Sequence, residues 1–86
     1  MSALQVITLA SVWKEVDPRL TRFVKVWAIG VGSTPVASGA APIRSGFITL
    51  CAVTPDTHEP IPGRRLTYAK QERFNGKRGG YALHCV

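Results

Sequence analysis

Acidic residues are scarce in this chain. Its 86 residues include only 5 Asp and Glu against 11 Lys and Arg, which leaves a formal net charge of +6. An excess of positive charge attracts nucleic acids and acidic protein surfaces, whatever the fold beneath it. The composition therefore predicts a nucleic acid or an acidic protein as partner. A charge that only keeps the protein in solution is the alternative.

Long apolar runs and paired cysteines are also lacking. No stretch reaches the length of a membrane span, and the first dozen residues lack the basic start and the apolar run of a signal sequence. The two cysteines, Cys51 and Cys85, are in no CxxC or other metal-ligand spacing. We therefore expect a cytoplasmic protein without membrane contact, and two reduced thiols packed in apolar stretches. A disulfide would require their strands to be adjacent, which the spacing leaves open.

Groupings that support catalysis or cofactor binding are missing too. The chain has no phosphate-binding loop, no dinucleotide fingerprint and no metal-ligand cluster. His84 lies far along the chain from the other histidine, His58. A weak metal patch of His58 with Asp56 and Glu59 is conceivable, although a solvated turn accounts for all three residues. We therefore expect no enzyme, no cofactor and no metal site.

Glycine and proline, in contrast, are abundant: 8 and 6 residues divide the chain into short segments. Short segments rich in β-branched and aromatic residues are typical of strands. The apolar pattern predicts strands over residues 4–9, 11–16, 22–29, 47–54, 64–68 and 81–86, with one helical turn within 69–74. A turn at Asp17-Pro18-Arg19 joins the second and third of these strands into an antiparallel hairpin.

The segment 22–29 is the most regular of the predicted strands. Its side chains alternate between two faces, with Val24, Val26 and Ala28 on one and Phe23, Lys25, Trp27 and Ile29 on the other. Because both faces are largely apolar, we expect a central, curved strand covered on two sides. The following segment, 30–46, consists mainly of small residues. It is expected to be a flexible loop, or a loop flanking a short edge strand near Val36.

The spacing of these elements predicts one all-β, mainly antiparallel domain over residues 1–86. Five or six short strands at intervals of roughly ten residues are typical of a small barrel or sandwich. An SH3-like barrel fits best, because such barrels have one short helical turn before the last strand. An OB-fold is the second choice, since it needs longer strands and a helix that the chain does not offer.

Most of the net charge is concentrated between residues 64 and 78. This segment has six basic residues and one acidic residue, Glu72, so it carries +5 of the total +6. Aromatic rings among basic side chains suit phosphate contacts and base stacking on single-stranded RNA or DNA. The predicted binding residues for nucleic acid or an acidic ligand are Arg64, Arg65, Tyr68, Lys70, Arg73, Lys77 and Arg78. An ordinary solvated basic face is the alternative, because Phe74 and Tyr81 fall at positions typical of a barrel core.

Two tryptophans suggest a different function. Trp13 and Trp27 lie on the two strands of the predicted hairpin and could face each other across it. Exposed tryptophans are typical of hot spots for protein partners. The alternative function is therefore a protein–protein interaction module, an adaptor or an inhibitor of a host complex, in which segment 30–46 orders on binding. Core packing of at least one tryptophan is the alternative. The oligomeric state stays open, because the predicted strand 4–9 could pair with a second copy of the chain at a sheet edge.

Four stretches of the chain form a pattern of their own. They are Val12-Trp13-Lys14-Glu15-Val16-Asp17-Pro18-Arg19, Arg22-Phe23-Val24-Lys25-Val26, Arg73-Phe74 and Gly80-Tyr81-Ala82-Leu83. In this pattern the chain resembles short uncharacterised proteins of bacteriophage and bacterial genomes, over most of its length except residues 30–46. The resemblance implies a small SH3-like barrel of phage origin, in the cytoplasm of a bacterial host, and assigns no binding or catalytic residue. Together with the basic segment, it favours a non-enzymatic binding module that contacts nucleic acid.

Overall fold

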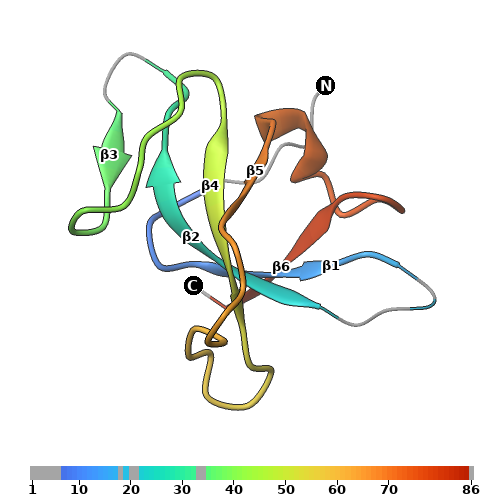
Figure 1. Ribbon diagram of the computed structural model, residues 1–86. Helices are drawn as coiled ribbons and strands as arrows, with labels where there is room; N and C mark the ends of the chain where they lie inside the picture. The colour runs from blue at the N-terminus through green and yellow to red at the C-terminus, as the bar shows by residue number, and fades with distance from the viewer. Residues whose placement is uncertain (1–6, 18, 20–21, 33–34, 86) are drawn as a thin grey trace.

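An antiparallel sheet of six strands makes up nearly all the regular structure of this chain (Figure 1). The computed structural model describes residues 7–17, 19, 22–32 and 35–85. The elements are β1 (Val12–Glu15), β2 (Phe23–Ile29), β3 (Val36–Ala37), β4 (Ile48–Val53), β5 (Thr67–Ala69), the 3-10 helix η1 (Gln71–Arg73) and β6 (Tyr81–Cys85). The predicted all-β, antiparallel architecture with one helical turn before the last strand is confirmed.

The long strand β2 organises the sheet, whose strand order is β5-β4-β2-β1-β6. Along one edge β2 pairs with β4. Along the other it pairs first with β1, over residues 23–25, and then with β3, over residues 28–29. The two end strands, β5 and β6, do not pair with each other among the described residues, so the sheet is bent but open (Figure 1).

The predicted hairpin between residues 11–16 and 22–29 is confirmed. Strands β1 and β2 pair antiparallel, and the Glu15 N–H donates to the Arg22 carbonyl oxygen at 2.8 Å. In the connecting turn the Arg19 N–H donates to Asp17 Oδ1 at 2.8 Å, which is the local bond expected of an aspartate in such a turn. The first half of the predicted strand over residues 4–9 lies outside the described residues, and residues 7–9 are not in a strand.

A bulge in β2 changes the predicted faces of this strand. The register with β4 shifts between Val26 and Ala28, which leaves Trp27 as the extra residue. As a consequence Ile29 packs against the main core, whereas Ala28 is buried outside it. The predicted alternation, which put Ala28 on the face of Val26, is wrong beyond the bulge.

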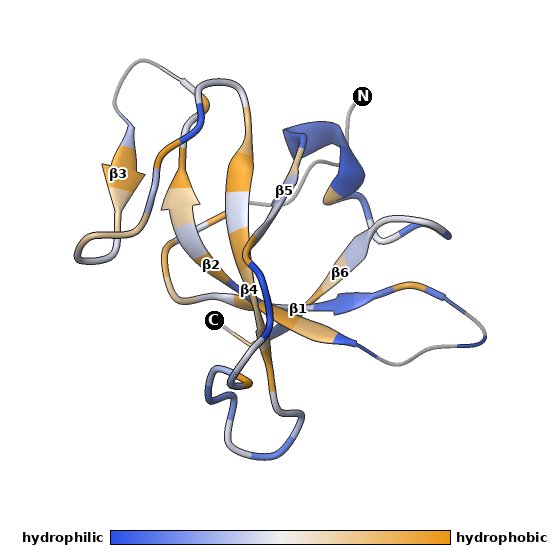
Figure 2. Ribbon diagram, in the orientation of Figure 1, coloured by the Kyte–Doolittle hydropathy of each residue, from blue (hydrophilic) through white to orange (hydrophobic). Residues whose placement is uncertain are grey.

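The core lies in the bend of the sheet and is built around three aromatic rings. Its buried residues are Trp13, Val24, Val26, Ile48, Leu50, Ala69, Phe74 and Tyr81. The Phe74 ring lies edge-on to Trp13, at 4.9 Å between centroids, and stacks on Tyr81 at 5.0 Å. Apolar residues follow β2 and β4 through the middle of the molecule, while η1 is hydrophilic (Figure 2). The helix therefore contributes to the core mainly by delivering Phe74, the residue that follows it.

The two tryptophans do not form a pair. Trp13 lies opposite Val24 in the β1–β2 ladder and is 0% exposed, and its Nε1–H donates to Ser11 Oγ at 2.9 Å. Trp27 is half-buried in the bulge. The prediction that the two rings face each other is wrong, and so is the suggestion of Trp13 as an exposed contact for a protein partner.

Segment 30–46 contains the predicted edge strand near Val36, since β3 pairs with the end of β2. The segment then returns to the sheet through two backbone hydrogen bonds of Gly30, from its N–H to the Phe47 carbonyl at 2.9 Å and from the Gly46 N–H to its carbonyl at 2.8 Å. A Cβ on Gly30 would lie 2.1 Å from the Arg44 carbonyl oxygen. Only glycine allows this close approach of the two backbones.

The two cysteines are on strands that are not adjacent. Cys51 is on β4 and Cys85 is on β6, with β2 and β1 between them, so they are not bonded to each other. Burial raises the pKa of the Cys51 thiol, and Lys25 on the neighbouring strand lowers it less.

Within the described part of the chain, no helix is long and apolar enough to cross a membrane.

Candidate functional site

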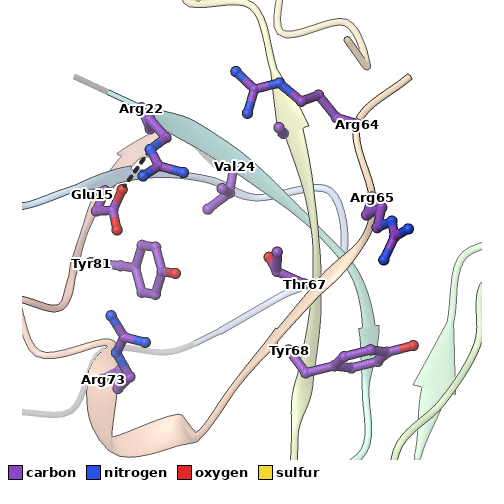
Figure 3. Close-up of a pocket in the computed structure, with 10 residues that line it drawn as sticks. Glu15, Arg22, Val24, Arg64, Arg65, Thr67, Tyr68, Arg73 and Tyr81 are labelled. Atoms are coloured by element: carbon purple, nitrogen blue, oxygen red, sulfur yellow. Dashed lines mark ion pairs between the residues drawn. The ribbon is translucent and has the colours of Figure 1, made fainter. Parts of the chain in front are cut away.

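A hollow of about 470 Å³ opens between the two end strands of the sheet (Figure 3). The residues that line it are Glu15, Arg22, Val24, Ala52, Arg64, Arg65, Thr67, Tyr68, Arg73 and Tyr81. They come from five strands, from η1, from the segment that precedes β5 and, for Arg22, from the residue just before β2. The hollow thus brings together side chains that are far apart in the sequence.

The floor of the hollow continues the hydrophobic core towards solvent. Val24 and Tyr81 belong to the core cluster. Ala52 lies opposite Val24 and shares a face of β4 with the buried Leu50, and Thr67 lies opposite Leu50. The floor is therefore apolar, with two hydroxyl groups, those of Thr67 and Tyr81, at its sides.

Four arginines surround this floor: Arg22, Arg64, Arg65 and Arg73. The one acidic residue among the lining residues is Glu15, whose Oε2 lies 3.2 Å from Arg22 Nε, so the lining carries a formal net charge of +3. In Figure 3, Arg22 and Arg73 point towards Tyr81 from opposite sides, and Arg64 extends towards Arg22 over the floor. Arg65 is directed away from Tyr81.

Backbone hydrogen bonds hold the segment that carries two of these arginines. Pro60 forms a β-bridge with Val53, and the Ile61 N–H donates to the Ala52 carbonyl at 3.0 Å, which places residues 60–61 alongside β4. Gly63 adopts a φ of 78° there, and this left-handed conformation turns the chain just before Arg64 and Arg65. The predicted strand over 64–68 is accordingly shorter, because regular pairing begins only at Thr67.

Arg73 is fixed by the loop that precedes β6. Its Nη2 donates to the Gly79 carbonyl at 2.6 Å, and its guanidinium carbon lies 5.3 Å from the centroid of the Tyr81 ring. A Cβ on Gly80 would come within 2.3 Å of the Arg73 carbonyl oxygen, so the loop packs tightly against the end of η1. In contrast, the guanidinium groups of Arg64 and Arg65 form no hydrogen bond or ion pair with any described residue.

The protonation of Tyr81 follows from its position between core and hollow. Burial raises the pKa of its phenol, with Arg73 and Arg22 lowering it less and Glu15 adding to the rise. The hydroxyl therefore stays neutral at physiological pH and can donate a hydrogen bond.

The predicted binding residues do not form one face. The structure brings Arg64, Arg65 and Arg73 together at the hollow. Tyr68 also lines it, but its ring is directed away from Tyr81 (Figure 3) and lies 5.3 Å from the guanidinium carbon of Arg44. Aromatic stacking beside the three arginines is therefore not available from Tyr68.

The other three predicted bases lie elsewhere. Lys70 is exposed just before η1, and the Lys77 N–H donates to Asn75 Oδ1 within the turn before β6. Arg78 lines a different, more open hollow together with Asp17. Of the six bases in the segment 64–78, these three are therefore not among the residues that line the arginine-rimmed hollow.

Arg22 lines the hollow but is not among the binding residues that the sequence predicts. It lies in the first half of the chain, outside the basic segment 64–78. A usable signal was present: Arg22 is two residues before Val24, so strand alternation puts both side chains on the core face. The predicted hairpin also places Arg22 beside Glu15, the residue with which it forms an ion pair.

No three His, Cys, Asp or Glu side chains converge as metal ligands in the described part of the chain. The metal patch weighed for His58, Asp56 and Glu59 is thus not formed. The His58 ring instead lies edge-on to His84, at 5.4 Å between centroids, and His84 lies edge-on to Phe23 at 4.6 Å.

The fold and the site define a small antiparallel β protein with an arginine-rimmed hollow at the open end of its core. Comparisons with protein-family models, with curated proteins and with solved structures find no match to this chain.

Proposed function

We propose that the protein is a non-enzymatic binding module that contacts nucleic acid through the arginine-rimmed hollow. The observation that carries the proposal is that four arginines line one concavity, whose single acid is itself paired with Arg22. A concave surface of one charge sign concentrates its potential and attracts polyanions. The planar guanidinium fork matches the geometry of phosphate oxygens.

The hydrogen bonds and ion pairs of the individual arginines support a phosphate ligand. Arg22 and Arg73 already have partners in the protein and are held in place by them. Arg64 and Arg65 keep all their donors for a ligand, because no described residue engages their guanidinium groups. Two fixed charges and two available ones provide both a defined site and new charge-assisted hydrogen bonds.

We also propose that the sheet is a small SH3-like barrel, as the resemblance to phage and bacterial proteins implies. Three features support this: the strand order β5-β4-β2-β1-β6, the bent β2 shared between the two halves, and η1 between the last two strands. The hollow is lined from both end strands, with Thr67 on β5 and Tyr81 on β6. A ligand would therefore bind where the barrel is open.

The proposal is tested by replacing one available arginine. We expect Arg64→Ala to weaken binding of a fluorescently labelled oligonucleotide about tenfold at about 50 mM salt, because a charge-assisted contact to phosphate is lost. Fluorescence anisotropy measures the dissociation constant. Binding of the unmodified protein should weaken steeply as the salt concentration rises.

Lys25→Ala is the matched control. It removes the same charge from the opposite face of β2, where Lys25 pairs with Cys51, and should change the affinity by about twofold or less. Equal losses in the two variants would show that only the overall charge matters. No binding of any oligonucleotide at tens of micromolar protein would reject the proposal and leave an acidic protein surface as the ligand to test.

A further inference from the structure

Two hydroxyl groups without a protein partner face the hollow. The hydroxyls of Thr67 and Tyr81 point into it from β5 and β6 (Figure 3). Neither group forms a hydrogen bond with a described residue, and both are reached by solvent, since no buried side-chain N or O atom of the described residues lacks a partner. A hydroxyl that no protein group engages can both donate a hydrogen bond to a ligand and accept one from it. These two groups are therefore placed to bond with a polar ligand.

The chemistry of the hollow changes from floor to rim. Val24 and Ala52 make the floor apolar, the two hydroxyls lie beside it, and the arginines stand at the rim. A free phosphate would satisfy the rim alone. A duplex would also engage mainly the rim, since its bases are stacked and paired inside. An unpaired nucleotide has an apolar base face for the floor, a polar base edge for the hydroxyls and a phosphate for the arginines at the rim.

We infer that the hollow holds one unpaired nucleotide, with its base against Val24 and Ala52, its base edge at the Thr67 and Tyr81 hydroxyls, and its phosphate at Arg64. The inference rests on the proposed function and narrows its ligand to single-stranded nucleic acid. A volume of about 470 Å³ is within the range of small-ligand sites, roughly 300–1,000 Å³.

The charge state of the hollow is compatible with this ligand. Because burial raises the pKa of Tyr81, its phenol is neutral and does not repel a phosphate. Glu15 is the one acid among the residues that line the hollow, and its carboxylate is paired with Arg22 at 3.2 Å.

The experiment compares three probes of equal length: a single-stranded oligonucleotide, the same backbone with abasic positions throughout, and a duplex. Competition anisotropy on the unmodified protein should rank the normal single strand first. Tyr81→Phe keeps the ring stacked on Phe74 but removes the hydroxyl. We expect it to weaken single-strand binding about three- to tenfold and to leave abasic and duplex binding unchanged.

Two further variants make this result specific. Thr67→Val removes the second hydroxyl with little change of volume and should act in the same direction as Tyr81→Phe. Thr57→Val makes the same change in the exposed turn before Pro60, outside the hollow, and should have no effect. Thermal unfolding checks that each variant is folded.

The inference is overturned if the abasic strand or the duplex binds as tightly as the normal single strand. It is also overturned if Tyr81→Phe leaves single-strand binding unchanged. If Arg64→Ala still weakens binding in either case, the proposed function is retained. If Arg64→Ala has no effect on binding, the proposed function is rejected as well.

Discussion

Tyr81 connects the core of this protein to its surface hollow. Its ring stacks on Phe74 at 5.0 Å between centroids, and the guanidinium carbon of Arg73 lies 5.3 Å from the ring centroid, while its hydroxyl faces the hollow (Figure 3). A single residue therefore takes part both in the packing that stabilises the sheet and in the site. Its titration provides a measure of that position.

The free energy of unfolding should fall at alkaline pH because of Tyr81. Burial raises the pKa of its phenol in the folded protein above the unfolded value of about 10. The contribution of the group to stability is thus fully present below pH ~10 and is lost as the pH rises through the folded pKa. Chemical denaturation at a series of pH values from neutral to alkaline measures this loss.

Tyr81→Phe is the control for this titration, since it lacks the ionisable group and keeps the ring. Its free energy of unfolding should depend less on pH above ~10 than that of the unmodified protein. Identical pH profiles for the two proteins would contradict the burial of the phenol.

At the level of elements, the close contact between β2 and the 30–46 segment depends on one glycine. Gly30 is buried and its φ is not in the left-handed region, so alanine would be tolerated by the backbone itself. The added Cβ would however lie 2.1 Å from the Arg44 carbonyl oxygen. We expect Gly30→Ala to lower the free energy of unfolding by about 1–3 kcal/mol, as overpacking of a tight site usually does.

Ser45→Ala provides the comparison for Gly30→Ala in urea denaturation. Ser45 is exposed in the same segment, and its replacement should change the free energy of unfolding by less than about 0.5 kcal/mol. If Gly30→Ala is as mild as Ser45→Ala, the segment does not pack against β2 as described.

The strands could be predicted from the sequence because their signals are local. Alternating apolar residues and the Asp17 turn are sufficient to predict the β1–β2 hairpin, and the helical turn before Phe74 was expected as well. The bulge at Trp27 was not predictable, because an extra residue in one strand becomes apparent only from its pairing with β4. That one residue reverses the faces of Ala28 and Ile29.

The same limit applies to Trp13 and Trp27. A tryptophan can belong to a core or to an interface, so the residue type alone assigns neither side chain. The pairing of Trp13 with Val24 and the bulge at Trp27 are what place them. The structure places Trp13 in the core beside Phe74, with its indole N–H bonded to Ser11.

At the scale of the whole molecule, the candidate site could not be predicted without the fold, because its residues come from separate parts of the chain. Three of its arginines belong to the basic segment 64–78 and were predicted, but Arg22 comes from the first hairpin, about forty residues before Arg64. The sheet order brings these parts together, because β5 and β6 lie at opposite ends of the sheet and the sheet bends. Composition alone shows that the chain is basic, and it cannot show that the charge surrounds a hollow with an apolar floor.

The most direct test of the account is an NMR titration of the ¹⁵N-labelled protein with a single-stranded oligonucleotide. The backbone amide and arginine side-chain signals of the hollow, above all Arg22, Arg64, Thr67 and Tyr81, should shift first and furthest. Signals of Lys25 and Phe23, on the opposite face of β2, should stay nearly in place. Shifts centred on that opposite face, or spread evenly over all basic residues, would contradict binding at the arginine-rimmed hollow.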